Sequence, residues 1–438
     1  MEQMKYPLTK ELIDFIDRSP VSFLAVEQLC SLLDENGFVR LYEQDDWKLS
    51  PSGKYYVTRN GSSVLAFRLP NGTPKGFMIA ASHSDSPSFR LKSDYALSAC
   101  DRYVKFNTER YGGGILSTWF DRPLSVAGRV LVEQNGAIVT KLFDGKKPLC
   151  LIPNVAIHLN RNMNDGFKIN PAVDTLPLFS LKEAEGSLET LISDALSVRP
   201  EQIVSHDLFV YNRDYGTFFG ADDAFFCAPR IDDLQCAYTT MRALWESEPF
   251  ESVSVCAVFD NEEVGSSTKQ GAASGLLEDV LGRIADSCQT SLLRMLPHSL
   301  MLSCDNGHAM HPNHPELSDA KNAPHLNGGV VIKHNANQKY TTDAVSEALF
   351  TAIAKRANVP IQHYANRSDI PGGGTLGSIS NTKVALNTVD IGLAQLAMHS
   401  AMETAGSLDT QYLSDSVHAF FETTVLQDGD GAFTLHTR

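Results

Sequence analysis

Hydrophobic residues recur every three or four positions in two segments near the start of the chain. This period predicts two amphipathic helices, at Lys10–Asp17 and Phe23–Leu33. The apolar run VLAFRL at 64–69 lies between two Asn-Gly pairs, which is a signal for a β-hairpin. The run GFMIAAS at 76–82 is continuously apolar, as is typical of a strand that is buried on both faces of a sheet.

Strand-like and helix-like segments alternate after Arg230. The predicted strands cover 252–260, 299–305, 329–334, 359–365 and 384–390, and the predicted helices are Leu234–Trp245, Leu276–Cys288, Thr342–Arg356 and Thr410–Thr424. Such alternation predicts an α/β fold, in which a mostly parallel sheet lies between layers of helices.

The segment 91–226 has a different texture, with many glycines and tyrosines and an alternation of aromatic and polar residues. Within it, Asn135-Gly136 separates the runs RVLVEQ and AIVTKLF and predicts a further hairpin. We therefore expect a mostly β domain, serving dimerisation or acting as a lid, inserted at 91–226. The catalytic domain would then be discontinuous and consist of residues 1–90 and 227–438.

Composition and charge exclude several classes of protein. Of the 438 residues 43% are hydrophobic, which excludes a disordered chain. The 37 Lys and Arg against 52 Asp and Glu give a formal charge of −15, which argues against binding to nucleic acid or to an anionic membrane. No apolar run approaches the ~18 residues of a membrane span, and the first residues lack the pattern of a signal peptide. We expect a soluble, cytoplasmic protein whose eight cysteines are mainly buried thiols.

Ionisable side chains gather where the predicted strands end. They are His83 and Asp85, then Asp260, Glu262 and Glu263, then Asp305 and His308, and finally Asp390, which leads to His399. Each has an ordinary structural explanation: a lone histidine is often a loop residue, Asp232 and Asp233 would cap a helix, and paired glutamates often form a solvated turn. However, ligands bind at the carboxyl ends of such strands, and carboxylates crowded there are costly without a cation. The combination favours a metal centre.

The residue types restrict the kind of metal site. The candidates include no cysteine, which excludes a structural Cys-rich zinc site. A set of more than three histidines and carboxylates suits a hydrolytic site with two divalent ions, commonly zinc, although manganese or cobalt would also fit. Adjacent glutamates can divide the work, because one can bind metal while its neighbour takes a proton from water.

Five segments resemble the signature blocks of the aspartyl aminopeptidase family, which are aminopeptidases with two metal ions. The segments are ASHSDSPSFRLK, PRIDDL, FDNEEVGS, SCDNGHAMHPNHPE and QLAMHS. They occur in the order and with the spacing of the family, and the resemblance covers nearly the whole chain. It implies the zinc-peptidase fold and removal of N-terminal residues from peptides.

The resemblance also implies roles for individual residues. Asp232 would bridge the two metals, His83 and Asp305 would complete one site, and Glu263 and His399 would complete the other. Glu262 would be the general base, and Asp85 would orient His83. Where the family has a PRLDN-like block, this chain has Asp233 in place of the asparagine, next to the bridging residue.

Further residues match the substrate contacts of the family, namely His158, His308, Lys333 and Tyr340. The resemblance implies that His158 reaches the site of a neighbouring subunit and that the protein assembles as a tetrahedral dodecamer. Lys333 matches the contact for an acidic side chain, so we expect a preference for N-terminal Asp or Glu. Preference for neutral residues, a related deacylase or carboxypeptidase, and a non-catalytic assembly protein are the alternatives.

Two other motifs do not support a site of their own. Gly372, Gly374 and Gly377 satisfy GxGxxG, but too few residues follow before the next predicted strand to form the helix of a dinucleotide site. The spacing HxxHxxH at His308, His311 and His314 is interrupted by prolines. We therefore expect a loop at the glycines and structural roles for His311 and His314.

Overall fold

Nine strands form the larger sheet of the computed structural model, which describes residues 5–184 and 186–437. The first four residues of the expected catalytic domain lie outside the described residues. In sheet order the strands are β1 (Val39–Arg40), β2 (Lys54–Arg59), β3 (Ser63–Arg68), β13 (Val253–Phe259), β4 (Phe77–His83), β14 (Leu300–Cys304), β18 (Asn387–Gly392), β16 (Val330–His334) and β17 (Ile361–Ala365).

Five of the eight neighbouring pairs in this first sheet are parallel, including the consecutive set β13, β4, β14 and β18. The remaining three pairs are antiparallel, and one of them is the hairpin β2–β3 at Asn60-Gly61. Strand β4 is buried along its whole length, as its continuous apolar run predicts. The expectation of a mostly parallel α/β sheet is confirmed.

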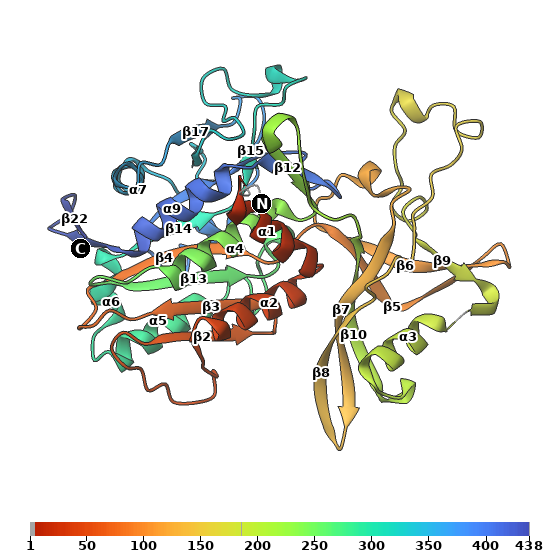
Figure 1. Ribbon diagram of the computed structural model, residues 1–438, viewed down its shortest axis with the longest axis horizontal. Helices are drawn as coiled ribbons and strands as arrows, with labels where there is room; N and C mark the ends of the chain where they lie inside the picture. Colours follow the sequence, from red (N-terminus) through yellow and green to blue (C-terminus); the bar gives the residue numbers. More distant parts are fainter. Residues whose placement is uncertain (1–4, 185, 438) are drawn as a thin grey trace.

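Helices cover both faces of the first sheet (Figure 1). One face packs against α1 (Pro7–Arg18), α2 (Ser22–Glu35), α4 (Ile231–Glu246), α7 (Ala344–Arg356) and α9 (Asp409–Phe421). The opposite face packs against α5 (Leu276–Ser287) and α8 (Leu376–Ser380), with α6 (Leu292–Met295) beside them. The two faces therefore have separate hydrophobic cores, each built from strand residues and from the helices that cover that face.

A second, antiparallel sheet lies beside the first and has a hydrophobic core of its own (Figure 1). Its strands, in order, are β8 (Ala137–Asp144), β7 (Leu124–Gln134), β10 (Ile203–Asn212), β5 (Ser88–Ala99), β6 (Tyr103–Tyr111) and β9 (Leu178–Leu181). Helix α3 (Ser187–Leu196) packs on it. The predicted hairpin at Asn135-Gly136 joins β7 to β8. The division of the chain at 91 and 226 stays a prediction.

A third sheet consists of short strands from distant parts of the chain. Its strands are β11 (Thr217–Phe219), β12 (Phe225–Ala228), β20 (Glu403–Gly406), β19 (Ala394–Leu396) and β15 (Gly307–His308). The pairing of β12 with β20 brings the chain just before α4 against the segment that follows His399. Because these strands have only two to four residues, hydrophobic periodicity gives no signal for them.

The end of the chain differs from the sequence expectation. The last helix ends at Phe421, whereas the pattern predicts that it reaches Thr424. Strand β21 (Thr423–Gln427) begins there and pairs with β22 (Phe433–Thr437). The β-branched residues Thr423, Thr424 and Val425 favour a strand over a further helical turn. Across the described residues, no helix has both the length and the apolar character needed to cross a bilayer.

Candidate metal centre

Three neighbouring parallel strands deliver three of the five predicted ligands, His83, Glu263 and Asp305, to one edge of the first sheet. Strand β4 ends at His83, β13 is followed by Asp260 and the Glu262–Glu263 pair, and β14 is followed by Asp305. Since β4 is hydrogen-bonded to β13 on one side and to β14 on the other, their carboxyl ends are adjacent. The sequence prediction that these strand ends converge is therefore met by the sheet order.

One group of donor atoms surrounds His83. Its Nε2 atom lies 3.4 Å from Oδ1 of Asp232 and 4.0 Å from Oδ1 of Asp305. All three side chains are buried, with 1%, 3% and 11% of their area exposed. The Nδ1 atom of His83 lies 3.0 Å from the Asp85 carbonyl oxygen, to which it can only donate. In the neutral ring that bond places the proton on Nδ1, so that Nε2 is the nitrogen available to bind a metal.

A second group surrounds His399. Its Nε2 atom lies 3.4 Å from Oδ2 of Asp232 and 3.1 Å from Oε1 of Glu263. Its Nδ1 atom lies 3.3 Å from the carbonyl oxygen of Gly113, which again selects the tautomer with a free Nε2. Asp232 thus faces both groups, with one carboxylate oxygen toward each histidine.

The donor atoms fit divalent cations. Among the described residues, Oδ1 of Asp232 and Oε1 of Glu263 are buried and accept no hydrogen bond. Burial raises the pKa of Glu262 to about 8, even though the nearby His83 opposes the rise. Burial likewise raises the pKa of Glu263 to about 7, although the nearby His399 opposes the rise. Cations in this cluster would offset the crowding of carboxylates that these raised pKa values reflect.

Asp85 connects the two glutamates to His83. Its Oδ1 accepts the Glu262 N–H at 3.1 Å, and its Oδ2 accepts the Glu263 N–H at 3.2 Å. The Tyr111 hydroxyl, at the end of β6, donates to Oδ2 at 2.7 Å. The Asn261 side-chain amide in turn donates to Tyr111 at 2.7 Å. Asp85 therefore fixes the turn that presents Glu262 and Glu263 as well as the His83 ring.

A residue that sequence reasoning missed, Glu403 of β20, holds the main chain on the other side. One of its oxygens accepts the Asp232 N–H at 2.9 Å, and the other accepts the His399 N–H at 2.6 Å. His399 itself has a φ of 67°, in the left-handed region that few side chains occupy. Nothing in the sequence marks Glu403 except its position four residues after His399.

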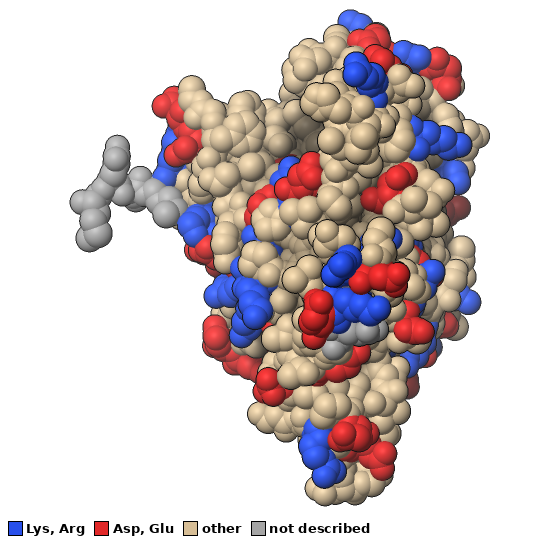
Figure 2. Space-filling model, turned by 90° about the vertical axis from the view of Figure 1, so that its right-hand side faces the viewer, with Lys and Arg blue, Asp and Glu red and all other residues tan. Residues whose placement is uncertain are grey.

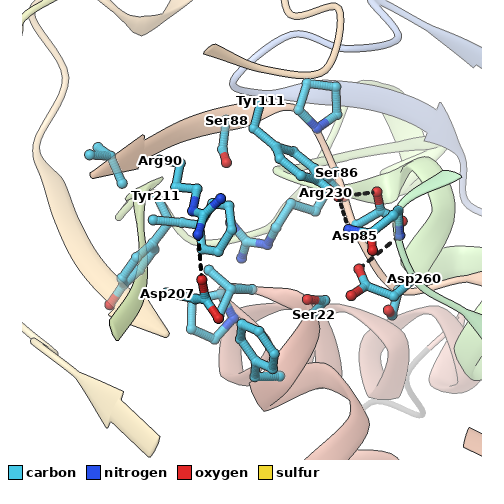
Figure 3. A pocket seen from close by; sticks show the side chains of 18 of the residues that line it. Ser22, Asp85, Ser86, Ser88, Arg90, Tyr111, Asp207, Tyr211, Arg230 and Asp260 are labelled. Atoms are coloured by element: carbon cyan, nitrogen blue, oxygen red, sulfur yellow. Dashed lines mark hydrogen bonds and ion pairs between the residues drawn. The ribbon is translucent and has the colours of Figure 1, made fainter. Parts of the chain in front are cut away.

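A cavity of about 420 Å³ lies behind this hydrogen-bond network, between the two main sheets. Asp85, Tyr111 and Asp260 line one end, and the ion pair of Arg90 with Asp207 lies at the other (Figure 3). The five expected metal ligands are not among its lining residues in the described chain. The cavity therefore borders the groups that support the ligands.

Two of the expected substrate residues adjoin the centre through Asp305. Lys333 of β16 is only 2% exposed. Its Nζ donates to the Asn306 carbonyl at 2.8 Å and lies 3.6 Å from Oδ2 of Asp305. The Tyr340 ring lies 5.6 Å from the same Nζ. Burial opposes the charge on Lys333, but the charge of Asp305 raises its pKa above the ordinary value.

The other two expected substrate residues differ in their relation to the centre. His308 lies near enough to Asp232 and His399 for their charges to act on its pKa. His308 of β15 is exposed, and its ring packs edge-on against Tyr364 with 6.2 Å between the ring centroids. His158 is exposed and lies in the loop that follows Ile152.

The sequence as a whole matches the family of aminopeptidase I zinc metalloproteases, M18, over residues 15–421. The chain belongs to the M18 family. The resemblance to aspartyl aminopeptidases is thereby confirmed, because that family is M18. The protein is a zinc-dependent aminopeptidase, in agreement with the prediction.

Individual M18 relatives match over almost their full length. The chain is 45% identical to the probable M18 family aminopeptidase 2 of Clostridium acetobutylicum over 94% of this chain and 98% of that one. A chain in the cryo-EM structure of the Ape4 and Nbr1 complex shares 36% sequence identity with this protein. The match covers 94% of this chain and 85% of that chain, with a TM-score of 0.91. The subunit of the S. cerevisiae mApe1 dodecamer shares 28% sequence identity with this protein. The match covers 95% of this chain and 96% of that chain, with a TM-score of 0.84.

Neither of the two motifs set aside from the sequence forms a site in this M18 chain. Residues 371–375, which include Gly372 and Gly374, form the expected loop, but the expectation is wrong for Gly377, which lies in the five-residue helix α8. His311 and His314 pack ring against ring with 5.3 Å between centroids, in the loop that follows β15. Asp390 of β18 accepts the Thr341 N–H and hydroxyl, so it anchors a loop.

Proposed function

We propose that the enzyme hydrolyses N-terminal peptide bonds at a centre with two divalent cations. Asp232 would bridge them, with His83 and Asp305 on one side and Glu263 and His399 on the other. The observation that carries this proposal is the position of Asp232, whose two oxygens each lie 3.4 Å from the free nitrogen of a different histidine. A carboxylate so placed is the bridging ligand that a two-metal site requires.

Zinc is the expected ion at both positions, and manganese or cobalt would also fit the donor set. When bound, the cations supply Lewis-acid activation of water and of the scissile carbonyl group. The ligands His83, Asp232, Asp305, Glu263 and His399 would hold these positions from five separate segments of the chain, so the fold assembles the site.

Glu262 would act as the general base. Its carboxylate lies within 4.8 Å of the donor atoms of His83 and Glu263 but completes neither of the two groups around Asp232. It can therefore accept a proton from the attacking water and deliver it to the leaving amine. Tyr340 or His308 would donate a hydrogen bond to the oxygen of the carbonyl under attack.

We propose a preference for N-terminal Asp or Glu, set by local positive charge near Lys333. The exterior has a formal excess of negative charge, −15 for the chain, so an acidic side chain must be attracted locally. A second candidate is a preference for neutral residues. It is favoured by the burial of Lys333, whose ammonium group already contacts Asn306 and Asp305.

The ratio of kcat/KM for the p-nitroanilides of Asp, Glu and Leu separates these two preferences. The acidic preference predicts that Asp or Glu is turned over best. Leu as the best substrate would establish the neutral preference and assign Lys333 to positioning Asp305.

We propose a homo-oligomer, built from dimers into a dodecamer like that of yeast Ape1. The loop containing His158 also exposes Val155, Ile157 and Leu159, the last with 82% of its area accessible. On the side of the molecule turned to the viewer in Figure 2, acidic and basic residues are dispersed over a largely uncharged surface. Exposed apolar side chains of this kind suit a subunit interface. Sedimentation of the full chain measures the oligomer size.

Digestion of a peptide library with and without a chelator tests the function as a whole. We expect loss of single residues from free N-termini, and no cleavage in the presence of chelator. N-acetylated peptides should be inert, whereas a deacylase or carboxypeptidase would accept them.

We also propose a cytoplasmic location, in keeping with eight cysteines that are all free thiols. Cell fractionation tests it.

A further inference from the structure

A second set of metal-binding side chains lies outside the catalytic centre. His334 is the last residue of β16, His363 lies in β17, and Glu347 lies in the first turn of α7. In Figure 1, β17 and α7 lie at the end of the molecule remote from the second sheet. These residues belong to none of the five signature segments.

The strand register brings the two histidines to one face. His334 pairs with Ala365, and His363 pairs with Ile332. Because alternate residues of a strand point the same way, both histidines project to the side on which Ile332 packs in the core that includes α7. Lys333, the residue between Ile332 and His334, points to the opposite face and contacts Asp305.

Three donor atoms form a closed triangle. His334 Nε2 lies 3.4 Å from His363 Nδ1, and Glu347 Oε1 lies 3.5 Å from that Nδ1 and 3.8 Å from that Nε2. Zinc bonds to nitrogen and oxygen of ~2.0–2.1 Å in a tetrahedron place neighbouring donor atoms ~3.4 Å apart. The triangle thus has the size of one face of a zinc coordination tetrahedron.

The same spacing occurs at the catalytic centre, where His399 Nε2 lies 3.4 Å from Asp232 Oδ2 and 3.1 Å from Glu263 Oε1. Each of these groups combines imidazole with carboxylate. At the second set the side chains are 33%, 31% and 47% exposed for His334, Glu347 and His363, so an ion can enter from solvent. Water can then supply the fourth ligand.

Neighbouring residues hold Glu347 in position and favour the neutral imidazole of His334. Asp343 and Ser346 form a capping box at the start of α7, which fixes the turn that carries Glu347. Burial lowers the pKa of His334, against the opposing charge of Glu347, and this favours the neutral imidazole that binds metals.

We propose that His334, Glu347 and His363 form an additional binding site for one divalent transition-metal ion, zinc in the first instance. The ion would join β16, β17 and α7, and so would hold the edge of the first sheet. This site is separate from the catalytic cations, and its occupancy does not depend on the function proposed above.

Equilibrium dialysis of the enzyme against buffered free Zn²⁺, followed by metal analysis, tests the site. Wild type should bind one zinc more per subunit than His363→Asn or Glu347→Gln. Zinc should raise the Tm of wild type above that of the metal-loaded variants. A far-UV spectrum and a Tm in chelator show that each variant is folded.

The matched control is His436→Asn, since His436 lies 3.2 Å from Glu251 as a surface pair without a second imidazole. It should retain the additional zinc. Equal zinc in wild type and in His363→Asn would overturn the site. Loss of the additional zinc in the control as well would also overturn it, because it would mean unspecific binding to surface histidines.

Discussion

The main-chain N–H of Glu262 donates to Oδ1 of Asp85, with 3.1 Å between the two atoms. The same oxygen lies 3.4 Å from Nδ1 of His83. One carboxylate therefore sets the position of the expected base relative to an expected metal ligand. Neither Glu262 nor His83 can shift without disturbing the other through Asp85.

Replacement of Asp85 should impair both metal binding and turnover. In Asp85→Asn the amide nitrogen faces the N–H of Glu262 or Glu263, so one hydrogen bond is lost. We expect zinc affinity or kcat to fall about 10–100-fold, as is usual for partners of metal ligands. Tyr111→Phe is the milder control, because it removes the hydroxyl bonds to Oδ2 and to Asn261 but leaves Asp85 bonded to both glutamate N–H groups. Equal losses in the two variants would contradict this account.

Glu262→Gln should separate chemistry from metal binding. The amide cannot accept a proton from water, so kcat should fall by roughly 100–10,000-fold. Zinc content should stay near that of wild type, because Glu262 is not among the expected ligands. Metal analysis and steady-state kinetics on one preparation give both values. Substantial activity in this variant would refute the role of Glu262 as base.

Glu403→Gln should weaken the centre through the main chain. The glutamine oxygen can accept only one of the N–H groups of Asp232 and His399, which leaves the other unsatisfied at a cost of about 1–3 kcal/mol. We expect about tenfold weaker zinc binding and a lower Tm in chelator. Glu422→Gln is the control, since Glu422 also accepts a main-chain N–H, that of Glu248, but away from the centre. It should bind zinc normally.

Asp409 should make the stability depend on pH. Burial raises its pKa to about 7, although the N–H groups of Gly329 and Asn327 oppose the rise. The native state then holds a proton that the unfolded chain releases near pH 4, so stabilisation is complete below about pH 4 and is lost as the pH rises to about 7. The slope is at most about 1.4 kcal/mol per pH unit.

Calorimetry of wild type and Asp409→Asn between pH 5 and 8 measures this contribution, at one protein concentration. At pH 5 the variant should have a lower Tm than wild type, because one N–H loses its acceptor. Between pH 5 and 7, however, its Tm should fall less than that of wild type. Asp415→Asn, on the exposed side of the same helix, should keep the slope of wild type. An unchanged slope in Asp409→Asn would assign the pH dependence to other groups.

Elements with a strong period or a continuous apolar run could be predicted from the sequence. Strand β4, the hairpin at Asn60-Gly61 and helix α5 are examples, because their residues carry the signal themselves. The third sheet could not be predicted, since strands of two to four residues are defined by their partners. The strand that begins at Thr423 could not be predicted, because the helical period of the preceding residues continues into its first residues.

The residues of the metal centre also divide into those whose position the sequence indicates and those whose position it does not. The convergence of His83, Glu262 and Asp305 follows from strand ends in a parallel sheet, which the sequence indicates. The support from Glu403 depends on the pairing of β12 with β20, a contact between residues far apart in the chain. The burial of Lys333 could not be read from the sequence either, because it results from how β16 packs near Asn306.

Two hydrogen bonds cross from the end of β6 to the metal centre, from Tyr111 to Asp85 and from His399 to Gly113. A rotation of the second sheet as a rigid body must lengthen them or carry their partners along. The orientation of the sheets and the retention of the cations are then one coupled equilibrium. By mass action, tight cation binding would favour the orientation of the sheets in which both hydrogen bonds form, and any force that separates the sheets would compete with the cations.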